Sequence, residues 1–141
     1  ANALLTDAFS RDLQESHGLT MADYEILVRL SESRPCGDDG AEHRMRMSEL
    51  AEATLSSRSR LSHQIDRMER EGLVERVPCT DDKRGYFAAL TTKGWDTLVA
   101  AAPSHVDSVR ARIVDVLTPE EFSALGHASR KLLDALGSEP A

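Results

Sequence analysis

The chain has 141 residues, of which 40% are hydrophobic, and a formal net charge of −7. This length and apolar content favour a single globular domain, spanning residues 1–141, with a sizeable core. The sequence holds no run of about 18 apolar residues, and its first residues lack the charged and apolar regions of an export signal. We therefore expect a cytoplasmic protein that makes no membrane contact.

The negative charge is unevenly distributed along the chain. Residues 41–93 carry ten Lys or Arg and nine Asp or Glu, a net charge of +1, so the other residues together carry −8. An acidic protein can still bind nucleic acid if its arginines are segregated onto one face. Net charge alone therefore does not exclude that class of function.

The first two predicted elements are helices. Apolar residues recur at helical spacing over residues 4–16, and His17-Gly18 then breaks the pattern. This amphipathic helix must pack on the chain's own core or on a partner subunit, and both remain open. A second helix runs from a Thr20 cap to about Ser33 and is apolar on most sides. We expect the second helix to be buried.

A short strand and a helix follow. Residues 44–47 alternate Arg and Met, which suits a strand. The next residues predict a short helix that is capped by Ser48, with three apolar side chains facing inward, namely Leu50, Ala51 and Leu55.

Residues 56–72 predict a longer helix with two different faces. A cap at Ser56 or Ser57 begins it, and Gly72 offers the left-handed conformation that ends helices. At about 100° per residue, one stripe is apolar (Leu61, Ile65, Met68) and the opposite face is polar and cationic (Ser59, Arg60, His63, Arg67, Arg70). With the preceding helix this forms a helix-turn-helix, whose second helix would enter a DNA major groove.

Two strands at residues 73–77 and 86–91 flank a polar eight-residue loop. They predict a hairpin, the wing of a winged helix, with Lys83 and Arg84 at its tip. A long helix is then expected over residues 92–117 with a kink at Pro103, and its apolar spacing suits packing along another helix. The last helix begins at the capping box Thr118-Pro-Glu-Glu121 and ends at Gly137.

This order of elements resembles the MarR (multiple antibiotic resistance regulator) family of bacterial transcription factors over essentially the whole chain. The most similar sequence words are Leu19-Thr20 with Tyr24-Glu-Ile-Leu, Ser48-Glu-Leu-Ala, Asp66-Arg-Met-Glu-Arg-Glu-Gly-Leu-Val-Glu-Arg, and Asp82-Lys-Arg-Gly-Tyr-Phe-Ala-Ala-Leu-Thr-Thr-Lys-Gly94. The implied fold is mainly α, an α+β winged helix. Residues 20–94 would bind DNA, and residues 1–17 and 95–141 would supply dimerisation helices.

The resemblance implies a homodimeric regulator, most directly a repressor, that binds a pseudo-palindromic double-stranded DNA operator. Arg84 would enter a minor groove and Asp82 would orient the wing. Bases and phosphates would be met by Ser57, Ser59, Arg60, Ser62, His63 and Arg67. His63-Gln64 departs from the family pattern, which often has Arg followed by an apolar residue, so base preference at that step is expected to differ.

The resemblance also implies release from DNA by a small aromatic carboxylate or phenol. Four residues are candidates for that ligand site because they offer cationic or aromatic groups, namely Arg11, His17, Tyr24 and Trp95. The alternative is that Tyr24 and Trp95 are core residues and that Arg11 is an ordinary surface charge.

Other functions are less well supported by the residues. The sequence has no glycine-rich phosphate loop, nucleophile elbow or His-Glu-x-x-His motif, and none of its histidines (17, 43, 63, 105, 127) lie three or four apart. We therefore expect no catalysis, cofactor or metal. Two regulatory alternatives remain: thiol-based redox sensing through Cys36 or Cys79, against which two reduced thiols are the simpler interpretation, and a winged helix that binds only proteins.

Overall fold

The computed structural model describes residues 1–35, 40–80 and 85–137. The elements in chain order are α1 (Asn2–His17), α2 (Met21–Ser31), β1 (Arg44–Arg46), α3 (Met47–Ala53), α4 (Arg58–Arg70), β2 (Val74–Pro78), β3 (Tyr86–Leu90), α5 (Thr92–Val109), the π-helical turn η1 (Arg110–Val114) and α6 (Pro119–Gly137). The mainly helical winged-helix fold expected from the sequence is confirmed.

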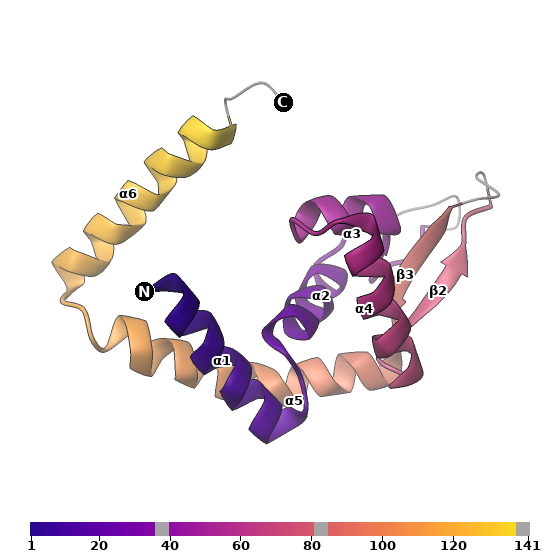
Figure 1. The fold of residues 1–141 in the computed structure, drawn as a ribbon, viewed down its shortest axis with the longest axis horizontal. Coiled ribbons are helices and arrows are strands. Elements are labelled where there is room, and N and C mark those ends of the chain that lie inside the picture. The colour runs from indigo at the N-terminus through magenta and orange to yellow at the C-terminus, as the bar shows by residue number, and fades with distance from the viewer. Residues whose placement is uncertain (36–39, 81–84, 138–141) are drawn as a thin grey trace.

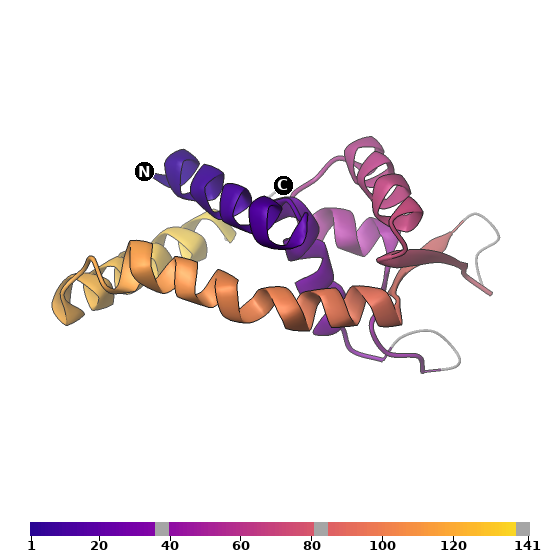
Figure 2. The ribbon, with the colours of Figure 1, turned by 90° about the horizontal axis from the view of Figure 1, so that it is seen from below.

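The molecule is elongated, with the helix-turn-helix and the sheet at one end and α6 at the other (Figure 1). Helix α5 runs along the long axis and connects the two ends, with α1 packed beside it (Figure 2). None of the helices in the described residues is long and apolar enough to cross a bilayer.

The sheet has three antiparallel strands in the order β1-β3-β2. Strand β3 pairs with β2 to form the predicted hairpin, with Val74 opposite Leu90 and Pro78 opposite Tyr86. The short strand β1 pairs with the other edge of β3, and Met45 lies opposite Ala88. The sheet therefore ties the segment before α3 to the base of the wing.

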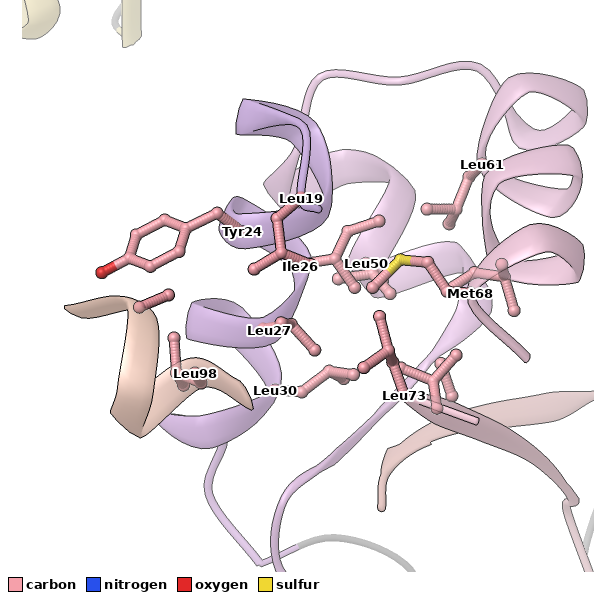
Figure 3. Close-up of a cluster of buried hydrophobic side chains, with 14 of the residues drawn as sticks. Leu19, Tyr24, Ile26, Leu27, Leu30, Leu50, Leu61, Met68, Leu73 and Leu98 are labelled. Atoms are coloured by element: carbon pink, nitrogen blue, oxygen red, sulfur yellow. The ribbon is translucent and has the colours of Figure 1, made fainter. Parts of the chain in front are cut away.

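A single hydrophobic core joins α2 to the helix-turn-helix, the sheet and α5 (Figure 3). Its largest fully buried apolar side chains are Leu13, Leu19, Ile26, Leu27, Leu30, Leu50, Leu61, Ile65, Met68 and Val74. The apolar stripe predicted for the second helix of the helix-turn-helix is thus confirmed as its buried face. That burial leaves the opposite face of α4 directed away from the core.

Several helix ends follow the predicted chemistry. The Thr20 hydroxyl accepts from the Asp23 amide at 3.1 Å, and the Thr118 hydroxyl accepts from the Glu121 amide at 3.2 Å. Ser57 is the N-cap of α4, where its hydroxyl accepts from the Arg60 amide, and Gly72 adopts φ +76° just after the helix.

The structure corrects two details of the helix-turn-helix. Helix α3 begins at Met47, so Ser48 lies within its first turn and is not the cap; the amide of Arg46, at the N-cap, donates to the Glu49 carboxylate at 3.4 Å. Leu55 does not face inward. It is 96% exposed and adopts φ +51°, because it occupies the left-handed position that closes α3, where glycine is usual.

Helix α5 also differs from the expected single helix ending at Leu117. Pro103 lies inside it, but α-helical geometry stops at Val109 and the chain continues as η1. Near this change the Ser108 hydroxyl donates to the Asp12 carboxylate at 2.6 Å, and Arg112 pairs with the same carboxylate at 2.7 Å. These contacts fasten α1 to the end of α5.

Candidate nucleic-acid interface

Helix α4 presents a polar, exposed surface that starts at its N-cap. Ser57, Ser59, Arg60 and His63 are all exposed, and Ser62 is half-buried. The structure therefore brings together, on one side of α4, five of the residues predicted to meet DNA.

The acids of α4 lie in its C-terminal half, whereas arginines lie in both halves. In the described part of the chain, Arg58 and Arg60 at the N-terminal end have no carboxylate partner. Toward the C-terminal end, Asp66, Glu69 and Glu71 pair with Arg67 and Arg76. Positive charge that is not neutralised is thus concentrated at the N-terminal end, where the helix dipole adds to it.

Arg67, which was predicted as a DNA contact, makes two ion pairs within the protein. Its guanidinium donates to the buried carboxylate of Asp23 on α2 and pairs with Glu71 at 3.5 Å. Only 37% of its side chain is exposed. Sequence periodicity placed Arg67 on the correct side of α4 but could not indicate that an acid 44 residues earlier would bind it.

Ser62 is likewise occupied by a contact within the protein. Arg76 of β2 donates to its hydroxyl at 3.2 Å and to its carbonyl at 3.1 Å. The same guanidinium pairs with Asp66 at 2.7 Å and with Glu69 at 2.9 Å. Arg76 therefore fixes the base of the wing against α4.

A surface pocket of about 530 Å³ lies between the start of α3, the start of α4 and the base of the wing. Its lining comprises Arg46, Met47, Ser48, Arg58, Leu61, Ser62, Arg76, Gly85 and Tyr86. Arg58, which has no carboxylate partner in the described residues, gives this concave surface a cation that suits a phosphate group, whereas Arg76 is already paired with Asp66 and Glu69. Arg46, Arg58 and Tyr86 were not singled out by the sequence, although Arg58 belongs to the same Ser- and Arg-rich run as Arg60.

Three predicted wing residues, Asp82, Lys83 and Arg84, lie outside the described residues, and so does Cys36. Cys79, at the wing base, is buried, and its amide donates to the Gly85 carbonyl at 3.0 Å. A buried thiol is a poor redox sensor, which needs an exposed thiolate.

The four candidate ligand residues do not form one site. Arg11 is exposed and pairs with Asp7 at 2.6 Å. Tyr24 is buried against the His105 ring, with centroids 4.5 Å apart, whereas Trp95 is 42% exposed and contacts His43 at a separate pocket of about 240 Å³. Positions 95 and 105 are about 15 Å apart along α5.

His105 was not proposed from the sequence, yet it is at the centre of an aromatic cluster between α1, α2 and α5. Its ring meets Phe9 edge-on at 5.6 Å and Tyr24 at 4.5 Å. Burial lowers the pKa of His105, which favours the neutral imidazole. Within the described residues, the Nδ1 atoms of both His105 and His17 are buried without a hydrogen-bond partner.

Comparison with known proteins identifies the family of this chain. The MarR family model matches residues 19–86. AbsC, a MarR family transcriptional regulator from Streptomyces coelicolor, is 50% identical in sequence to this chain. Its crystal structure superposes with a TM-score of 0.84, and the match covers 98% of this chain and 88% of AbsC. The chain belongs to the MarR family.

Two further relatives agree with this assignment. Sco3205, a MarR family transcriptional regulator from Streptomyces coelicolor solved in complex with DNA, is 42% identical with a TM-score of 0.85, covering 99% of this chain and 82% of that one. The transcriptional regulator HosA from Escherichia coli O111:H- is 37% identical over 86 residues, 61% of this chain and 63% of HosA. The alignment thus spans less than two thirds of HosA. All three of these relatives are described as transcriptional regulators.

Proposed function

We propose that this MarR family chain is a homodimeric, sequence-specific regulator that binds double-stranded DNA and represses transcription. The observation that carries the proposal is the exposed N-terminal end of α4, where Arg58 and Arg60 have no carboxylate partner in the described residues. Cations on a helix that can enter the major groove contact phosphates and guanine edges. A winged helix that bound only proteins would need an anionic partner surface to offset this cluster of positive charge.

The shape of the site supports one way of docking. With the start of α4 in a major groove and the wing at the neighbouring minor groove, the DNA backbone between the grooves passes over the pocket that contains Arg46, Arg58 and Arg76. In this proposal Arg60, with Ser59 and His63, meets base edges. Lys83 contacts phosphate, Arg84 enters the minor groove and Asp82 orients the wing.

The homodimer is supported by apolar side chains that this chain leaves uncovered. None of the residues described in α6 is buried, and Leu132, Leu133 and Leu136 are each about two thirds exposed. A stable helix with such a face normally packs against another surface. A second copy of the chain would also place two α4 helices on successive major grooves, about 34–36 Å apart.

The test is selection of duplexes from a random library by the wild-type protein, followed by fluorescence anisotropy with a selected and a scrambled duplex at two salt concentrations. We expect at least a hundredfold preference for the selected duplex and a steep loss of affinity with salt. Arg60→Ala should lose about 1–3 kcal/mol of that preference. Arg70→Ala, on the last turn of the same helix, should retain it.

Failure to enrich any sequence, with equal binding to both duplexes or to neither, would contradict sequence-specific recognition. Retained preference in Arg60→Ala would instead remove Arg60 from its proposed role while leaving DNA binding intact. Repression is tested separately by placing the selected sequence upstream of a reporter gene, where added protein should lower expression.

A small aromatic carboxylate or phenol is proposed as the releasing ligand. The buried Nδ1 atoms of His17 and His105 and the Tyr24 ring favour the region between α1, α2 and α5, because an acid group could donate to or pair with an imidazole there. Millimolar benzoate and phenol derivatives should displace bound DNA. His105→Phe should abolish that displacement while preserving DNA affinity, and identical sensitivity in the variant would exclude this region.

A further inference from the structure

Asp23 is unusual among the acids of this chain because it is completely buried. In the described residues it is the one carboxylate below the surface, with 0% of its area exposed. A buried charge is costly unless it is paired and hydrogen-bonded. The partners of Asp23 should therefore indicate why an acid is kept at this position.

The two carboxylate oxygens of Asp23 bind different parts of the molecule. Oδ2 accepts from the Thr20 amide at 2.9 Å, which completes the capping box of α2. Oδ1 accepts from Gln64 at 3.3 Å and from the Arg67 guanidinium, both on α4. Capping needs only the first oxygen, so the second is available to hold α4.

The start of α2 is itself bound to α1. The Met21 amide donates to the Ser10 hydroxyl at 3.1 Å, and the Leu19 amide donates to the Leu13 carbonyl at 3.4 Å. A continuous series of polar contacts thus runs from α1 through the Thr20 turn to Asp23 and on to α4. Helix α1 belongs to the proposed dimerisation region, and α4 to the proposed DNA interface.

We propose that Asp23 is a positioning residue for DNA recognition: by holding Arg67 and Gln64 it fixes the angle of α4 relative to α1, and so sets the distance between the two α4 helices of the dimer. The inference rests on the proposed DNA-binding function. It assigns Arg67 to the orientation of α4 and not to contact with DNA. A helix of 13 residues is about 20 Å long, so a tilt of about 10° moves its end by about 3 Å, roughly one base-pair step.

The test compares three variants with duplexes that differ only in the spacing of their half-sites. Asp23→Asn keeps the size of the side chain but removes its charge. Arg67→Gln removes the other charge of the Asp23–Arg67 pair. If Asp23→Asn fails to fold, Arg67→Gln still tests whether the pair positions α4. Glu71→Gln is the matched control, because it removes only the exposed partner of Arg67 and leaves the contact with Asp23. Anisotropy is measured on the selected duplex and on versions with one base pair inserted or deleted between the half-sites.

We expect Asp23→Asn and Arg67→Gln to bind the selected spacing at least tenfold more weakly and to lose most of the discrimination against altered spacing. The dependence of their affinity on salt should match that of the wild type, because no phosphate contact is removed. Glu71→Gln should behave as the wild type does.

Three results would overturn the proposal. Unchanged spacing preference in a folded Asp23→Asn or Arg67→Gln variant would mean that the pair contributes to stability alone. A reduced salt dependence in Arg67→Gln, with normal or tighter binding by Asp23→Asn, would mean that Arg67 contacts DNA. If Glu71→Gln loses as much affinity and spacing discrimination as the other two variants, then the contact of Arg67 with Asp23 is not the one that positions α4. Failure of the proposed function looks different, since the wild type itself would then show no preferred duplex.

Discussion

At the scale of single residues, the side chains of α4 divide by what they touch. Arg60 and His63 face solvent, whereas Arg67 is bound to an acid on α2. Helical periodicity in the sequence predicted which side of α4 each residue occupies. It could not predict that pairing, because a contact between residues 44 positions apart depends on how the helices pack and has no local signal in the sequence.

The Asp23 carboxyl should make stability depend on acid pH. Burial by itself raises its pKa, but hydrogen bonds from Arg67, Thr20 and Gln64 together outweigh burial and hold the pKa below its ordinary value of 3.8. Because the folded state favours the carboxylate, this contribution to stability is complete above pH 3.8. It is lost as the pH falls through the lowered pKa.

Urea unfolding at a series of pH values checks this expectation. Asp23→Asn should lower the free energy of unfolding by about 2–4 kcal/mol at neutral pH and show less further loss below pH 3.8. Asp12→Asn is a useful comparison, because a hydrogen bond from Ser108 and the nearby Arg112 also lower the pKa of Asp12. If the free energy of unfolding falls equally with decreasing pH in the wild type and in Asp23→Asn, then Asp23 is not the titrating group.

The wing arginine gives a second prediction at this scale. Arg84 lies outside the described residues, and its role is proposed from the family resemblance. Arg84→Ala should weaken binding most strongly where an A·T-rich minor groove flanks the half-site, because that groove is narrow and strongly negative. Lys83→Ala should weaken binding to all duplexes alike. Anisotropy with A·T-rich and G·C-rich flanks tests both, and equal losses for Arg84→Ala on the two flanks would contradict minor-groove insertion.

At the scale of elements, local chemistry in the sequence was most informative at helix ends. The Thr20 cap, the Thr118 capping box and the Gly72 stop are found where they were predicted, and Ser57 is the one of the two candidate serines that caps α4. The errors occurred where a helix ends earlier than the apolar pattern in the sequence suggests. Leu55 matches an apolar stripe in the sequence, but α3 ends before it, and the π-helical turn after Val109 had no recognised signal.

Helix α6 carries the prediction that belongs to this scale. The wild-type protein should sediment as a dimer at micromolar concentration, because the exposed apolar face of α6 is proposed to pack on a second copy. Leu133→Glu should weaken dimerisation at least tenfold, since it places a charge in that face. Lys131→Glu, on the opposite side of α6, should leave the dimer intact. A monomeric wild type would contradict the proposed operator geometry.

At the scale of the whole molecule, the acidic net charge and the proposed DNA binding are compatible. The central segment holds ten of the 17 Lys and Arg residues, and the remaining segments carry the net charge of −8. A DNA duplex is repelled by those acidic regions and attracted to the start of α4 and the wing. Charge segregation would therefore orient the protein as it approaches DNA.

The position of α6 also bears on how the protein is made. Its capping box lets the helix begin on its own, but none of its described residues packs into the core of the same chain. Translation completes α1 to β3, with most of the core, before α6 leaves the ribosome, so these elements can pack before α6 is available. A newly made chain would thus acquire the fold proposed to contact DNA before it acquires the helix proposed to pack on a second copy. Subunit pairing would be the late step in biogenesis, and it would depend on the local concentration of freshly synthesised chains.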